Sequence, residues 1–188
     1  VERFIRGAEH RLLVVGGKMV AANKGDMVSV VGDGEHCIDE LIETQINSDP
    51  RRGVEHEFPL YLIKLADYPA AQMEVARQGF TGASVPAAGQ EVMIVRTSNM
   101  AFDVTDEVHP DTAELACLAA RIVGLDIAGV DLVCEDISKP LAVQQGAIVE
   151  VNAGPGLLMH IKPAVGQPRP VGEAIVDHLF AKDEDSRI

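Results

Sequence analysis

The sequence has 188 residues, a formal net charge of −13, 47% hydrophobic residues and only 4% aromatic residues. This length suits one domain with a substantial core, and the balance of hydrophobic and charged residues excludes a disordered chain. Sixteen basic residues against 29 acidic ones exclude a general binder of nucleic acid or of anionic membranes.

No signal-peptide pattern is present, and no apolar run approaches the roughly 18 residues of a membrane span. The three cysteines (Cys37, Cys117 and Cys134) lie far apart and form no C-x-x-C pair. This usage is typical of reduced structural thiols, so we expect a cytoplasmic protein without disulfides.

Residues 1–31 are expected to form an antiparallel β-meander. Gly16-Gly17 indicates a two-residue hairpin, since glycine accepts positive φ without steric cost. Gly32-Asp33-Gly34 then ends the strands. The strands are expected at residues 1–5, 11–15, 18–22 and 27–31.

Residues 35–89 are expected to form a small helical insertion between two stretches of sheet. Apolar residues at helical spacing predict a first helix, and residues 67–78 predict a second one that stops at Gly79. The apolar positions of the first helix are Ile38, Leu41, Ile42 and Ile46. A strand at residues 91–95 follows the insertion.

The last third of the chain has the clearest pattern. His109-Pro110-Asp111 is typical of a helix start, and an apolar stripe continues from it to Gly124. Two strands are expected at residues 127–134 and 147–151, and an amphipathic helix at residues 170–180 closes the chain.

The strongest candidate site lies on these two strands. Because strand side chains alternate, we expect Glu150 and Asn152 to point one way while Val149 and Val151 point into the core. If the strands pair as a hairpin, Asp131 reaches the same face as Glu150. Two carboxylates and an amide oxygen are hard oxygen donors that suit Mg²⁺. A solvated strand end with ordinary polar residues is the alternative, and spacing alone leaves both open.

At this point the sequence resembles a known family. Residues 149–156, with Gly129-Val130-Asp131 upstream, resemble the metal-binding end of an ATP-grasp ligase. Together with other segments in the same order, they resemble the later part of the ATP-grasp domain in the cyanophycin synthetase family. These segments are residues 1–7, 11–18, 31–34, 47–53, 85–89, 103–110 and 124–131.

The resemblance covers nearly the whole chain, and it implies an α+β fold. This fold is the C-terminal lobe of ATP-grasp, a mostly antiparallel sheet flanked by helices with a small helical insertion. Residues 1–34 would form sheet with the adenine hinge, 35–89 the insertion, and 90–188 the metal-binding core and closing helix.

The resemblance also implies the site residues. The Mg²⁺ ligands would be Asp131, Glu150 and Asn152, and the catalytic residues would be Arg96, Glu150 and Asn152. Residues that would contact ATP are Glu2, Arg3, Phe4 and Ile5 at the adenine hinge, Glu9 on the ribose, Val133 against adenine, and Arg11 and Lys24 near phosphate. Without the family pattern, Glu2 and Glu9 are equally well surface charges, and Val133 a core residue.

The implied function is ADP-forming amide ligation, with ATP and Mg²⁺ as cofactors. Aspartate would be added to a polyaspartate backbone, so the partners are aspartate, arginine and a cyanophycin-like polymer, in a homo-oligomer. The earlier half of the ATP-grasp unit is not recognised in the sequence, so the segment alone is expected to be inactive. Two alternatives remain open: another ATP-grasp peptide ligase, of the glutathione-synthetase or RimK-like kind, and a non-catalytic assembly module.

Overall fold

The computed structural model describes residues 3–54 and 58–180, and the chain divides into two compact units. Unit 1 comprises Val1–Lys24 and Phe102–Ile188, and unit 2 comprises Gly25–Ala101. Strand β2 (Lys18–Val31) begins in unit 1 and ends in unit 2, whereas β5 (Glu91–Asp103) runs from unit 2 into unit 1.

The sheet of unit 1 has the strand order β2-β1-β6-β7 and is antiparallel throughout. Its other strands are β1 (Ala8–Val15), β6 (Ile127–Cys134) and β7 (Ala147–Asn152). The predicted hairpin turn is present, since Gly16 and Gly17 have φ values of 55° and 75° between β1 and β2. The prediction of a mostly antiparallel sheet is confirmed.

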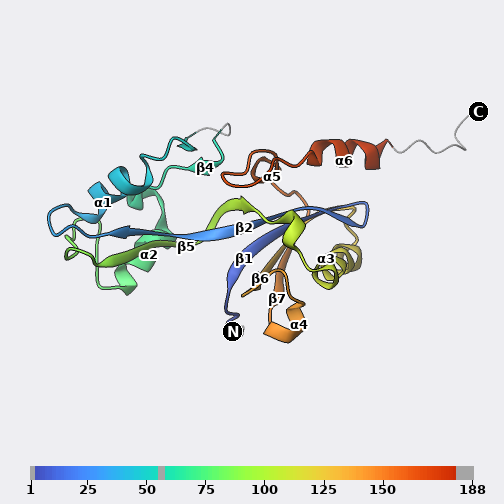
Figure 1. Ribbon diagram of the computed structural model, residues 1–188, viewed down its shortest axis with the longest axis horizontal. Helices are drawn as coiled ribbons and strands as arrows, with labels where there is room; N and C mark the ends of the chain where they lie inside the picture. The colour runs from blue at the N-terminus through green and yellow to red at the C-terminus, as the bar shows by residue number, and fades with distance from the viewer. Residues whose placement is uncertain (1–2, 55–57, 181–188) are drawn as a thin grey trace, which may run out of the picture. The chain divides into compact units, whose positions relative to one another are not determined.

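Helices cover both faces of this sheet, with α6 (Val171–Leu179) above and α3 (Pro110–Val123) below the β1–β2 hairpin in Figure 1. Helix α3 begins where the sequence predicts, because the His109 imidazole accepts a hydrogen bond from the Asp111 N–H over 3.1 Å. Alternation along β1 supplies both cores: Leu12 and Val14 pack in the cluster with α3, and Leu13 packs in the cluster with α6.

Unit 1 differs from the prediction at its beginning. Residues 3–7 are not in a strand, although their alternation predicts one. Gly7 has a φ of +125°, which interrupts an extended chain immediately before β1. Short helical elements were also not predicted. They are the 3-10 turn Thr105–Glu107, α4 (Leu141–Gln144) and α5 (Leu158–Ile161).

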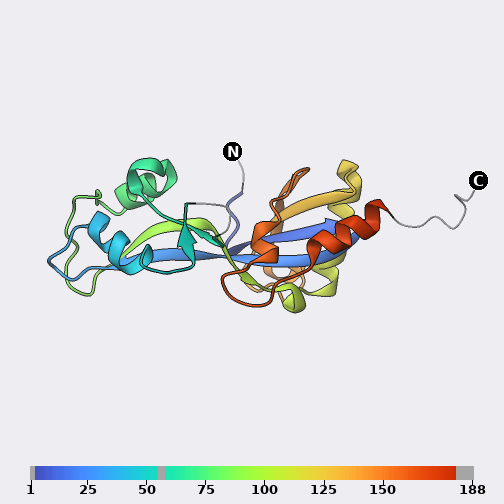
Figure 2. The same ribbon diagram turned by 90° about the horizontal axis from the view of Figure 1, so that it is seen from above.

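In unit 2 the rest of β2 pairs with β5, and α1 and α2 pack onto these strands (Figure 2). The predicted helix at residues 38–46 is α1 (Ile38–Leu41) continuing into a π-helical turn, Ile42–Ile46. The predicted second helix is α2 (Pro69–Arg77). The remaining elements are β3 (Arg52–Gly53), β4 (Leu60–Tyr61) and the 3-10 turn Leu65–Asp67.

The strands of unit 2 are longer than predicted. β2 continues through Asn23-Lys24-Gly25-Asp26 without the expected interruption, and β5 extends beyond residue 95 to Asp103. Polar residues within both strands conceal this continuity in the sequence pattern, since period-two alternation identifies a strand only where one face is apolar.

Candidate functional site

A row of polar side chains crosses the four strands of unit 1. Arg11 on β1 is the register partner of Asn23 on β2 and of Asp131 on β6. Asp131 is in turn the partner of Glu150 on β7. Register partners in a sheet point to the same face, so sequence positions up to 139 residues apart form one polar surface.

The Asp131 carboxylate is held from two sides. The Arg11 guanidinium donates one hydrogen bond through Nε to Oδ1 and another through Nη2 to Oδ2, the second over 2.7 Å. Asn152 Nδ2 donates to the same Oδ2 over 3.1 Å. The Arg11 and Asp131 side chains are 20% and 15% exposed, so solvent screens this ion pair only partly. Two of the predicted metal ligands are therefore in direct contact.

A β-bulge sets the direction of the side chains on β7. The register shifts between Asp131 and Leu132, whose partners are Glu150 and Ile148, so Val149 is the extra residue. The prediction that Val149 points into the core is wrong: its side chain is 56% exposed, and Ile148 packs against the core instead. Val151 packs against the core as predicted.

The donor set of this face fits a hard divalent cation. Asp131 and Glu150 lie opposite each other, where Cβ atoms of register partners are about 5 Å apart. In residues 3–54 and 58–180 no group of three or more histidine, cysteine or acidic side chains could hold a metal ion. A cation here would therefore complete its shell with an amide oxygen, water or substrate oxygens, as Mg²⁺ commonly does.

The predicted hinge residues line a cavity of about 400 Å³. Arg3, Phe4 and Ile5 form one side of it, and Arg3 donates a hydrogen bond to Oε1 of Gln145. Phe4 is 80% exposed, so its ring is available to a ligand. Glu2 lies outside the described residues. The full lining is Arg3, Phe4, Ile5, Arg6, Glu135, Val143, Gln144 and Gln145.

Two other predicted contacts continue the polar face of β1 and β6. Glu9 is the register partner of Val133, and both stand two residues before or after the Arg11–Asp131 pair on the same face. Val133 is half-buried. Lys24 on β2 is exposed, but its register partner is His10, so it lies on the opposite face of the sheet from Arg11 and Asp131. Arg96 lies in β5, but its side chain is outside the described part of the structure.

The sequence of this chain is similar to segments of longer proteins of known function. Cyanophycin synthetase from Trichormus variabilis is 45% identical to this chain over 193 residues, which cover 100% of this chain and 21% of that protein. The protein of the same name from Crocosphaera subtropica is 42% identical, with coverage of 100% and 22%. The chain resembles a segment of cyanophycin synthetase. No family model matches it.

Glutathione-forming proteins are also similar. The bifunctional glutathione biosynthesis protein GshAB from Clostridium perfringens is 34% identical, with 96% of this chain and 23% of that protein covered. The crystal structure of a bifunctional glutathione synthetase from Pasteurella multocida superposes with a TM-score of 0.64 at 31% identity, covering 95% of this chain and 25% of that one. The chain thus has the fold of an ATP-grasp ligase segment, as the sequence predicts.

This chain spans about a fifth of the length of the cyanophycin synthetases that it matches. The described helices are all too short or too polar to cross a membrane.

Two buried polar residues, Asn23 within the polar row and His160 next to it, are not among the predicted site residues. His160 on α5 is 1% exposed, and neither ring nitrogen has a hydrogen-bond partner among the described residues. Burial, together with a smaller effect of the Arg11 charge, lowers the pKa of His160 to about 4. Asn23 is fully buried and donates to the Met159 carbonyl over 2.9 Å. In the sequence, Asn23 directly follows the apolar residues 19–22, and this position is the signal that could have indicated a buried polar group.

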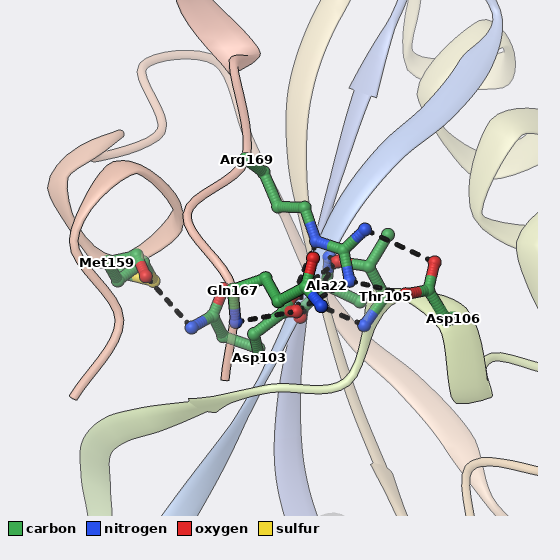
Figure 3. A network of polar contacts seen from close by, with 8 residues as sticks. Ala22, Asp103, Thr105, Asp106, Met159, Gln167 and Arg169 are labelled. Carbon is green, nitrogen blue, oxygen red and sulfur yellow. Dashed lines mark hydrogen bonds and ion pairs between the residues drawn. The ribbon is translucent and has the colours of Figure 1, made fainter. Parts of the chain in front are cut away.

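The segment that carries His160 is fixed by an ion-pair cluster, shown in Figure 3. Arg169 donates to Asp103 through Nη2 over 2.6 Å and to Asp106 over 2.7 Å, and its backbone N–H donates to the His160 carbonyl. Asp103 also accepts a hydrogen bond from the Thr105 hydroxyl. Burial raises the pKa of Asp103, but the bonds from Arg169 and Thr105 outweigh burial and hold the pKa below its usual value.

Proposed function

We propose that this chain is the metal- and ATP-phosphate-binding segment of an ADP-forming carboxylate–amine ligase of the cyanophycin synthetase kind. The observation that carries the proposal is the Asp131–Glu150 register pair, with Asn152 bonded to Asp131, in a chain 45% identical over its whole length to cyanophycin synthetase. A carboxylate pair on a rigid sheet supports hard-cation binding because it fixes two charged oxygen donors before any ligand arrives.

The proposed roles rest on the family resemblance and, for Asp131, Glu150, Asn152 and Arg11, also on their placement on one face of the sheet. Asp131, Glu150 and Asn152 would hold Mg²⁺, which would neutralise the charge of the phosphates during phosphoryl transfer. Arg11 lies directly beside these residues, within reach of an anionic oxygen bound on the same face. The hinge residues Arg3–Ile5 would hold adenine, and Glu9 would accept hydrogen bonds from the ribose hydroxyls. Arg96 would bind phosphate or carboxylate, and the same role is proposed for Lys24 from the resemblance alone, since Lys24 lies on the opposite face from Arg11.

The reaction needs no side-chain nucleophile. A substrate carboxylate oxygen attacks the γ-phosphorus of ATP, the bond to the β-phosphate oxygen breaks, and ADP leaves. An amine nitrogen then attacks the acyl carbon, inorganic phosphate leaves, and the amine loses a proton. Such chemistry depends on positioning and on charge neutralisation, which fixed carboxylates and guanidinium groups supply.

The proposed substrates are aspartate, arginine and a cyanophycin-like polymer, in a cytoplasmic homo-oligomer. The net charge of −13 is compatible with a polymer that carries arginine side chains. To test this, the full-length protein is incubated with MgATP, aspartate, arginine and a polymer primer while ADP release is followed. Primer-dependent ADP release is expected, and its absence would overturn the polymer assignment.

A glutathione-synthetase-like ligase is the second candidate, supported by 34% identity to GshAB over 96% of this chain. The same assay with γ-glutamylcysteine and glycine in place of the primer distinguishes the two, since only this candidate gives ADP with these substrates. A non-catalytic module, the third possibility, predicts no Mg²⁺-dependent nucleotide binding with any of them.

A further inference from the structure

The stem of the Arg11 side chain passes over Gly129 on β6. A Cβ atom added to Gly129 would come within 3.2 Å of Arg11 Cδ and 2.9 Å of Pro155 Cβ. The absence of a side chain at Gly129 therefore leaves the space in which the arginine stem crosses from β1 over β6. At the end of this stem the guanidinium reaches both oxygens of Asp131.

This arrangement puts an internal cation on a predicted metal ligand. Without Arg11, the paired carboxylates of Asp131 and Glu150 carry two negative charges. With Arg11, the three groups together carry one negative charge. A divalent cation that approaches Asp131 meets the guanidinium already hydrogen-bonded to both carboxylate oxygens, and two cations at one carboxylate repel each other. Metal binding at Asp131 is therefore disfavoured for as long as Arg11 keeps this partner.

We propose that Arg11 is an exchangeable counter-cation: it occupies Asp131 in the metal-free protein and moves to a phosphate oxygen of the nucleotide when the metal binds. The inference rests on the proposed function and adds that metal binding and nucleotide binding are coupled through Arg11. Metal alone would bind weakly, because releasing Arg11 leaves a partly buried guanidinium without an anion. Metal and nucleotide together would bind cooperatively, because the phosphate supplies the anion that Arg11 loses.

A purely structural role for the Arg11–Asp131 ion pair predicts a different result for the coupling of metal and nucleotide binding. If Arg11 and Asp131 only hold β1 against β6, removing the guanidinium lowers stability and leaves Asp131 without its partner, but it does not uncouple metal from nucleotide. The two accounts therefore differ in binding measurements on the same variant, independently of catalytic turnover.

The test compares wild type with Arg11→Met, whose unbranched side chain can occupy the space over Gly129, and with Arg11→Lys, which keeps the charge without the guanidinium fork. Mn²⁺ binding is followed through the electron paramagnetic resonance signal of the free ion, with and without ADP. Arg121→Met, an exposed arginine on α3, is the matched control. Thermal unfolding of each variant shows that it is folded.

Loss of a charge-assisted pair predicts about tenfold tighter binding of Mn²⁺ alone to Arg11→Met. The gain in Mn²⁺ affinity on adding ADP should fall by about the same factor in this variant. For Arg11→Lys, the Mn²⁺ affinity and the effect of ADP should lie between those of wild type and Arg11→Met. Arg121→Met should match wild type in both. Unchanged Mn²⁺ affinity in Arg11→Met and Arg11→Lys, or an undiminished effect of ADP, would overturn the proposal.

A variant of the metal ligands separates this proposal from the one on which it rests. If Glu150→Gln binds Mn²⁺ and ADP like wild type, the metal site itself is wrongly placed. If Glu150→Gln loses that binding while the Arg11 variants behave like wild type, the metal site stands and only the counter-cation role is refuted.

Discussion

Asp131 on β6 and Glu150 on β7 are register partners, and the adjacent β-bulge places one extra residue, Val149, beside them. The bulge lets Ile148 and Val151 pack into the same core cluster while Glu150 stays on the polar face. Simple alternation would have put Ile148 and Glu150 on one face. The position of the carboxylate pair and the packing of β7 are thus linked through one irregularity.

This arrangement predicts that truncating Ile148 and truncating Val149 lower the free energy of unfolding by different amounts. Ile148→Ala should lower the free energy of unfolding by about 1–2 kcal/mol, because it removes methyl groups from the core. Val149→Ala should change it by less than about 0.5 kcal/mol, since that side chain is 56% exposed. Urea unfolding of both variants measures the difference. A larger loss for Val149→Ala would show that the register is wrong.

A side chain at position 7, next to the hinge residues, is predicted to destabilise the protein through a clash with the backbone. A Cβ atom there would lie 2.2 Å from the Cys134 carbonyl group, at a φ of +125°. Gly7→Ala should therefore destabilise the protein by about 2–4 kcal/mol, through a clash with backbone added to the conformational strain.

Gly79 provides the matched control for this substitution. It also has a positive φ, +85°, but no atom lies within 4 Å of an added Cβ. Gly79→Ala should cost only the conformational strain, about 1–2 kcal/mol. Equal unfolding free energies for the two variants would argue against the close approach at Cys134.

The buried histidines predict a loss of stability in mild acid. Burial lowers the pKa of His10 and of His160 from 6.5 to about 4, so the unfolded chain binds more protons than the folded one between these values. Stability should be full above pH 6.5 and fall as pH decreases toward 4, by about 3 kcal/mol for each histidine. Urea unfolding at several pH values in this window measures the slope.

His160→Gln should make this slope shallower, because glutamine removes one of the two titrating groups. An unchanged slope in His160→Gln would show that this ring is accessible to protons in the folded protein.

The Arg169 cluster predicts different effects for its two carboxylates. The Asp103 side chain is 5% exposed, and that of Asp106 is 77% exposed. Asp103→Asn should cost about 3 kcal/mol, because it leaves a largely buried guanidinium with one exposed partner. Asp106→Asn should have little effect, as for most exposed ion pairs. Chemical denaturation compares them, and similar losses would mean that both pairs are equally solvated.

Much of this fold could be predicted from local sequence patterns. The Gly16-Gly17 hairpin, the His109 start of α3 and strand β6 all depend on residues close together in the chain. The pairing of Asp131 with Glu150 could also be inferred, since their strands follow each other in the sequence and consecutive strands commonly pair.

Features that depend on distant residues could not be predicted. Arg169 and Asp103 are 66 positions apart, and neither has a local pattern that indicates the other. His160 has no periodic neighbours that reveal its burial, and the bulge at Val149 is decided by the packing of Ile148 against other elements. The contact of Arg11 with Asp131, across 120 positions, follows only once β1 is known to lie beside β6.

Binding of ADP to the full-length protein, measured by calorimetry with and without Mg²⁺, tests the central claim most directly. Glu150→Gln removes one proposed ligand charge, and Glu114→Gln removes an exposed acid on α3, which covers the opposite face of the sheet. We predict that Mg²⁺-dependent ADP affinity falls about tenfold or more in Glu150→Gln and is unchanged in Glu114→Gln. Wild-type affinity in Glu150→Gln would contradict the assignment of this face as the metal and nucleotide site.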